Sequence, residues 1–204
     1  MKIYLSIILF LCTCHCSFGQ DFNTPLHVFF QKNADSTIFY SFDNYSSPDP
    51  YFLILSKKGD TLSAFTYKAK KITEDRSNLP FNIRYALFLR DRFGITKVPV
   101  AVNAYFNPVF LSRDSLFAFW QSVSKQDIWT IKDDLQDGGE GCPKIKNGQD
   151  ISDGGGITFQ LITKQEIRKL HFYAPAFYEK QCPGRKGRKA AINIEMLFSR
   201  YFKE

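Results

Sequence analysis

The sequence predicts a single α+β domain with a mainly antiparallel sheet built from hairpins and with two or three helices. Two stretches carry this prediction, because each consists of two β-type runs joined by a short turn. They are residues 51–70, turning at 57–60, and residues 156–175, turning at 163–166. No repeat or long low-complexity linker divides the chain. Its 16% aromatic content, with 21 Phe, is typical of a folded core.

The N-terminal end is typical of a secretory signal peptide. Lys2 precedes an apolar run from Ile3 to Cys12, and small and polar residues follow as far as Ser17-Phe18-Gly19. Small residues at the −3 and −1 positions suit signal peptidase, so we expect cleavage after Gly19. The run is about half of the roughly twenty apolar residues that an uncleaved membrane anchor needs. The cysteines at positions 12, 14 and 16 leave a lipoprotein signal as the alternative.

The chain therefore divides into a signal peptide, residues 1–19, and one α+β domain, residues 20–204. We expect a secreted or periplasmic protein, with no transmembrane span after signal cleavage because no second apolar stretch is long enough. The net charge of +7 favours non-specific attraction to anionic partners. Nucleic acid is not an expected partner, since the chain is exported and carries no aromatic RNA-binding signature.

Local signals place the first elements of the domain. Residues 36–44 are β-branched and aromatic and end in turn formers, which predicts a strand. In the hairpin of residues 51–70, Gly59 supplies the positive φ of the turn. Residues 78–94 alternate like a strand, but a capping Asn at the start and Gly94 at the end favour a helix.

The later elements follow from similar signals. Residues 97–110 are extended and β-branched, and two prolines place them near a sheet edge. Ser112 caps a short helix, which is followed by a glycine-rich segment and the second hairpin. Residues 184–202 predict a C-terminal helix. Its apolar stripe consists of Ala191, Ile194, Leu197, Phe198 and Tyr201.

Only two cysteines, Cys142 and Cys182, remain after signal cleavage. Two cysteines in an exported chain are most simply explained by a disulfide. It would close a loop of about forty residues and stabilise the fold by roughly 3–4 kcal/mol in the chain-entropy model. Free thiols and an intermolecular bridge are the alternatives.

Residues 137–156 hold seven of the twelve glycines, and acidic side chains occur from Asp133 to Asp153. Carboxylates on a glycine-rich frame are compatible with calcium, but neither the EF-hand order nor the nonapeptide repeat is present. Glycine and aspartate are also the ordinary residues of turns. A solvated loop without a metal is therefore the favoured interpretation.

A basic cluster surrounds Cys182. It consists of Lys180, Arg185, Lys186, Arg188 and Lys189. Such a run can bind anionic polymers or membrane headgroups, and the alternative is a solvated loop and helix start. Cations at a helix N-terminus are mildly unfavourable, so either the helix starts later or the charges serve another purpose. A Cys142–Cys182 bond would bring this cluster next to the acidic loop.

No catalytic residue, metal site or cofactor is predicted. His27 and His171 are the histidines left after signal cleavage, and neither has a partner at a diagnostic spacing. Nucleophile-elbow, zincin, P-loop and Rossmann motifs are absent from the sequence, as is zinc-type Cys/His spacing. The alternative is a secreted hydrolase without a known motif, using carboxylates of the 133–153 segment with His171.

The C-terminal half contains the stretches "DIWTIKDD", "DGGGITFQLITKQEIRKLHFYAP" and "AAINIEMLFSRYF", and the leader ends in "FGQ". In these stretches the chain resembles small uncharacterised exported proteins of Bacteroidota. The resemblance implies no established activity and no functional residues. Because the expected fold is exported, disulfide-stapled and without a catalytic constellation, we expect a non-catalytic binding or structural module of the bacterial envelope, for example an inhibitor or immunity-type protein. Its partner would be an envelope protein or an anionic polymer.

Overall fold

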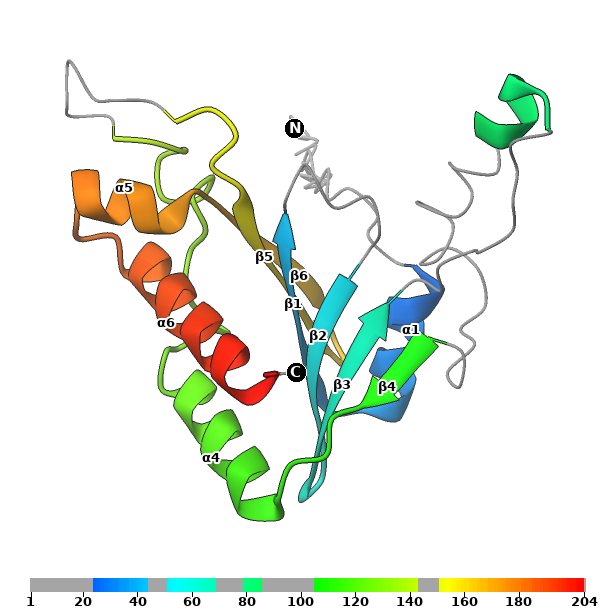
Figure 1. The fold of residues 1–204 in the computed structure, drawn as a ribbon. Helices are drawn as coiled ribbons and strands as arrows, with labels where there is room; N and C mark the ends of the chain where they lie inside the picture. Colours follow the sequence, from blue (N-terminus) through cyan, green and yellow to red (C-terminus); the bar gives the residue numbers. More distant parts are fainter. Residues whose placement is uncertain (1–23, 44–50, 69–78, 86–104, 143–150, 204) are drawn as a thin grey trace, which may run out of the picture.

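One six-stranded antiparallel sheet organises the protein, as the computed structural model shows for residues 24–43, 51–68, 79–85, 105–142 and 151–203 (Figure 1). The strand order is β4-β3-β2-β1-β5-β6. The strands are β1 (Ser36–Asp43), β2 (Tyr51–Lys58), β3 (Thr61–Lys68), β4 (Phe106–Pro108), β5 (Gly156–Thr163) and β6 (Ile167–Tyr173). The α+β class and the antiparallel sheet are confirmed.

Helices cover both faces of the sheet (Figure 1). They are α1 (Pro25–Asn33), α4 (Arg113–Ser124), α5 (Pro175–Gln181) and α6 (Lys186–Tyr201). The sequence predicted α4 and α6 but not α1 or α5. Of the helix expected at 78–94, residues 81–85 are helical, and the part beyond them lies outside the described residues. The predicted signal peptide also lies outside them.

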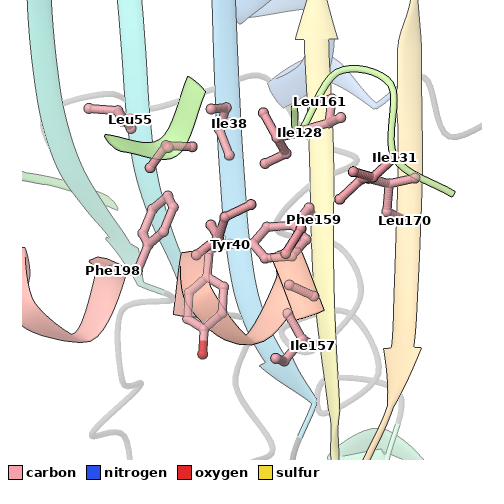
Figure 2. Packing of buried hydrophobic residues seen from close by; sticks show 14 of the residues in the cluster. Ile38, Tyr40, Leu55, Ile128, Ile131, Ile157, Phe159, Leu161, Leu170 and Phe198 are labelled. Atoms are coloured by element: carbon pink, nitrogen blue, oxygen red, sulfur yellow. The ribbon is translucent and has the colours of Figure 1, made fainter. Parts of the chain in front are cut away.

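Two hydrophobic clusters hold the helices against the sheet, because successive strand side chains point to opposite faces. Ile38 and Tyr40 on β1 face α4 and α6, where Phe119, Ile194 and Phe198 are buried (Figure 2). The alternate strand residues pack against α1 on the opposite face. A layer of helix on each side of one sheet therefore encloses the core.

Both predicted hairpins are present. β2 and β3 join through Gly59, which has a φ of +55°, and β5 and β6 join through residues 164–166. Strand β1 lies between the two hairpins, because it pairs with β2 on one side and with β5 on the other, from Ser36 opposite Thr163 to Asp43 opposite Gly156. The β1–β5 pairing connects distant parts of the chain. The end of β6 lies beside Asp133 and Asp134 of the 125–142 segment.

Local signals explain the helix starts. The Oγ of Ser112 accepts a hydrogen bond from the Ser115 backbone N–H at 3.1 Å, which confirms the predicted cap of α4. The start of α1 has Thr24 as N-cap and proline at the first helical position. Among the described residues, no helix has both the length and the apolar character that a membrane crossing requires.

Candidate functional site

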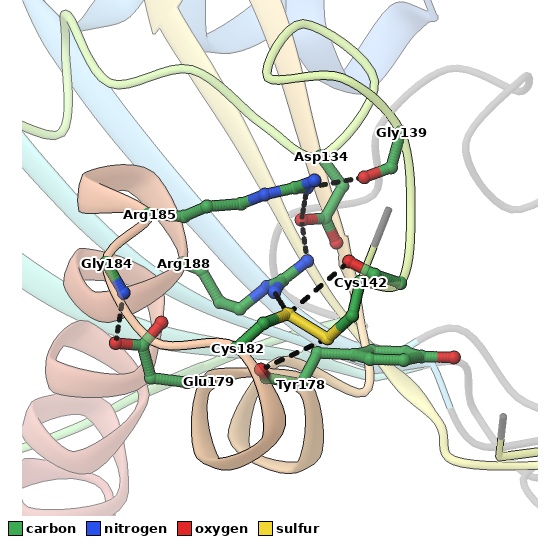
Figure 3. Close-up of a disulfide and its surroundings, with 10 residues drawn as sticks. Asp134, Gly139, Cys142, Tyr178, Glu179, Cys182, Gly184, Arg185 and Arg188 are labelled. Carbon is green, nitrogen blue, oxygen red and sulfur yellow. Dashed lines mark hydrogen bonds and ion pairs between the residues drawn. A yellow bond between two sulfur atoms is a disulfide. The ribbon is translucent and has the colours of Figure 1, made fainter. Parts of the chain in front are cut away.

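A disulfide joins Cys142 to Cys182, as the sequence predicts (Figure 3). The Cα atoms of the two residues are 5.8 Å apart. Cys142 ends the described part of the 125–142 segment, and Cys182 follows α5 directly. The bond therefore fixes the glycine-rich segment to the turn that leads into α6.

A buried ion pair lies beside this disulfide (Figure 3). Nη2 of Arg188 lies 2.8 Å from Oδ1 of Asp134, and Nη1 of Arg185 lies 3.4 Å from the same oxygen. Arg188 also places its guanidinium 5.4 Å from the centre of the Tyr178 ring, and Arg185 donates to the Gly139 carbonyl. Two of the five predicted anion-binding residues are thus engaged with the protein itself.

The start of α6 explains why cations occur there. The helix begins at Lys186, so its first turn carries positive charges that the helix dipole disfavours. Arg188 is 1% exposed and directed toward Asp134 rather than toward solvent. This residue serves the packing of α6, whereas Lys186 and Lys189 remain exposed.

Asp133 and Asp134 bind the free edge of the sheet. Oδ2 of Asp133 accepts from the His171 backbone N–H at 3.3 Å, and Oδ2 of Asp134 accepts from the Tyr173 backbone N–H at 3.0 Å. These contacts satisfy N–H groups of β6 on the side away from β5, where the described residues contain no further strand. Both aspartates are buried, so the interpretation of the acidic stretch as a solvated loop is wrong for these two residues.

The side chain of His171 faces an acid from a different element. Its Nε2 lies 3.5 Å from Oδ2 of Asp43 on β1, and the same oxygen accepts a 2.6 Å hydrogen bond from Oγ1 of Thr158. In the described ranges, no three His, Cys, Asp or Glu side chains are grouped to hold a metal ion. His27 is buried and packs α1 on the sheet, with Nε2 2.6 Å from Oε1 of Gln160.

The remaining lysines of the basic cluster separate into two places. Lys180 lies exposed on α5. Lys186 and Lys189 line a groove of about 640 Å³ between the start of α6 and the 125–137 segment. Lys125, at the end of α4, and Lys132 line the same groove from the opposite wall. We call this hollow the lysine groove.

A close backbone contact sets the two walls of the lysine groove against each other. A Cβ atom placed on Gly187 would lie 1.9 Å from the carbonyl oxygen of Lys132, so a larger residue does not fit there. Nδ2 of Asn193 donates to Oε1 of Gln126 at 3.0 Å and links the walls further along α6. The disulfide and the Asp134–Arg188 pair also join the 125–142 segment to the start of α6 and the turn before it.

The groove continues along α6 into a second hollow of about 290 Å³. Lys125, Gln126 and Asn193 line both hollows, and Met196, Leu197 and Arg200 belong to the second. Positions 186, 189, 193, 197 and 200 recur at helical spacing, so they lie on one face of α6. From 186 to 200, which are 14 helical steps apart, this face is about 21 Å long.

Positive charge dominates the first hollow. Asp127 and Asp137 are the acids among its lining residues, against four lysines. Within the described part of the chain, none of these lysines forms an ion pair with a carboxylate. A concave surface with charges of one sign concentrates its potential, so the lysine groove attracts anions.

Sequence reasoning found Lys186 and Lys189 because they belong to a run of basic residues. It missed Lys125 and Lys132, which are isolated in the sequence and reach the groove through tertiary packing alone. Comparison with protein-family models finds no matching family, and comparisons with curated proteins and with solved structures find no significant match.

Proposed function

We propose that the protein is an exported, disulfide-stapled, non-catalytic binding module of the bacterial envelope that binds an anionic partner in the lysine groove. The observation that carries this proposal is the convergence of Lys125, Lys132, Lys186 and Lys189 on one hollow. Like charges held near each other oppose folding. An anionic partner would relieve this repulsion on binding.

The rigidity of the walls supports the same function. The disulfide, the buried Asp134–Arg188 pair and the Gly187 contact hold both walls before any partner arrives. A preformed site loses less conformational entropy on binding, which favours affinity. Because the lysines are exposed, we expect the binding to weaken as salt is added.

The test measures binding of a fluorescent polyglutamate peptide by anisotropy to the protein lacking residues 1–19. A triple variant, Lys132→Ala, Lys186→Ala and Lys189→Ala, should bind about tenfold more weakly, as the loss of about 1.4 kcal/mol would produce. The matched control removes the same charge at exposed lysines outside the groove, with Lys32→Ala, Lys58→Ala and Lys68→Ala.

The control should bind as the unmodified protein does. An equal loss in both triple variants would show attraction by net charge alone and would overturn the proposed site. Absence of binding at low salt would overturn it as well. Export is tested separately. The protein recovered from the periplasm should have the mass of a chain that begins at Gln20.

A further inference from the structure

We infer that the occupant of the lysine groove is an extended acidic peptide segment of a partner protein, with an apolar side chain at the Met196–Leu197 end. This inference rests on the proposed function and names the class of partner. The two connected hollows differ in character along α6. The first is lined by lysines and polar groups, whereas Met196 and Leu197 give the second an apolar surface beside Lys125 and Arg200.

The apolar end argues for a side chain rather than a uniform polyanion. Met196 is 55% exposed although it lines a concave surface, and Leu197 beside it is partly buried. A methionine of this kind adapts its shape to the apolar groups that it meets, and such residues are frequent on peptide-binding surfaces. Arg200 lines the same end, so a partner segment can pair a carboxylate with Arg200 while it places an apolar side chain against Met196 and Leu197.

Two amides in the middle of the groove match the polar groups of a peptide bond. Asn193 and Gln126 share one hydrogen bond, and each belongs to both hollows. In the described structure, Oδ1 of Asn193 and Nε2 of Gln126 have no hydrogen-bond partner. They offer one acceptor and one donor, which a backbone N–H and C=O require.

The lining and the length of the groove favour a peptide over a carbohydrate. No aromatic residue is among the residues that line either hollow, whereas sugar-binding surfaces commonly use the flat faces of Trp and Tyr. The α6 face is about 21 Å long. At about 3.4 Å per residue, that length accommodates an extended segment of about six residues.

The experiment compares how tightly three labelled probes of equal negative charge bind to the protein lacking residues 1–19. The first is a peptide with a glutamate run followed by leucines, the second has serines in place of the leucines, and the third is an oligogalacturonate. We expect the first peptide to bind about tenfold more tightly than the other two, since burial of a leucine accounts for that ratio.

Substitutions test whether the preference for the leucine peptide arises in the groove. Met196→Ser should remove most of the difference between the two peptides and leave the serine peptide unchanged. Phe110→Ser, at a 91% exposed residue outside the groove, is the matched control and should preserve the difference. Asp127→Asn removes an acid from the groove and should strengthen binding of both peptides about twofold to threefold, as expected for an exposed charge.

The outcomes separate this inference from the proposed function. Equal binding of the two peptides, or tight binding of the oligogalacturonate, would overturn the peptide inference and leave an anion-binding groove. A preference for leucine that survives Met196→Ser would place the apolar contact elsewhere and overturn it too. Loss of binding by all three probes would reject both proposals.

Discussion

The guanidinium of Arg188 and the carboxylate of Asp134 form an ion pair removed from solvent, with Nη2 2.8 Å from Oδ1 and exposures of 1% and 2%. Asp134 also accepts a hydrogen bond from the backbone of Tyr173 at 3.0 Å. One carboxylate therefore connects α6 with the outer strand of the sheet. Taking both charges out of water offsets much of their attraction, so the loss of one partner costs more stability than the intact pair contributes.

Replacing one partner of this pair should destabilise the protein strongly. Arg188→Met leaves the Asp134 carboxylate buried without its closest counter-charge, and such losses cost 3–5 kcal/mol, so we expect about 3 kcal/mol because Arg185 stays near the same oxygen. Urea unfolding measures the change. Lys189→Met, at an exposed neighbour, is the control and should change stability by less than about 0.5 kcal/mol. Equal stability of the two variants would contradict a structural role for Arg188.

Reduction of the Cys142–Cys182 bond should lower the free energy of unfolding by roughly 3–4 kcal/mol, because the open loop regains conformational freedom in the unfolded chain. Unfolding with and without reductant measures this difference. The double variant Cys142→Ser and Cys182→Ser should match the reduced protein and show no further response to reductant. Alkylation of both thiols without reductant, seen by mass spectrometry, would refute the bond.

Gly187 should resist replacement by alanine although it lies within a helix. Alanine usually stabilises helices by up to about 1 kcal/mol over glycine, but its Cβ would meet the Lys132 carbonyl at 1.9 Å. We expect Gly187→Ala to lower stability by about 1–3 kcal/mol. Ser199→Ala, at an exposed site on the same helix, should be neutral or slightly stabilising. A stability gain for Gly187→Ala would show that the walls of the lysine groove are free to separate.

Much of the fold could be predicted because its signals are local. Gly59 marks one hairpin turn, Ser112 caps α4, and the apolar stripe of the C-terminal helix matches its buried face. The pairing of β1 with β5 could not be predicted, since it depends on which hydrophobic faces meet in three dimensions. Helix α1 was missed although Thr24 and Pro25 form a recognisable start signal.

Of the candidate site, too, one part could be predicted from local sequence and another part could not. A run of basic residues in the sequence points to Lys186 and Lys189, but its spacing does not separate them from Arg188, which is buried. That distinction depends on Asp134, whose position is set by the outer strand of the sheet. Lys132 reaches the groove because Gly187 allows a close approach, which is a property of tertiary packing.

The carboxyl of Glu195 should lower the stability of the folded state in a way that depends on pH. It accepts a 3.4 Å hydrogen bond from the hydroxyl of buried Tyr40. Burial raises the pKa of the Glu195 carboxyl above its ordinary value, and the Tyr40 hydrogen bond offsets part of that rise. Burial likewise raises the pKa of Tyr40, so the hydroxyl stays protonated and continues to donate. The folded state therefore favours the neutral carboxyl more than the unfolded state does.

The sign of the effect follows from this raised pKa. Below the unfolded pKa of Glu195 both states bind the proton and no penalty exists, whereas stability falls as pH rises toward the folded pKa and stays lower above it. Glu195→Gln keeps an acceptor for Tyr40 and removes the charge, so the melting temperature at neutral pH should rise by about 2–4 °C. The melting temperature of this variant should also depend less on pH below neutral pH. Glu166→Gln, at an exposed turn, should leave the pH dependence unchanged, and an unaltered pH dependence in Glu195→Gln would contradict the penalty.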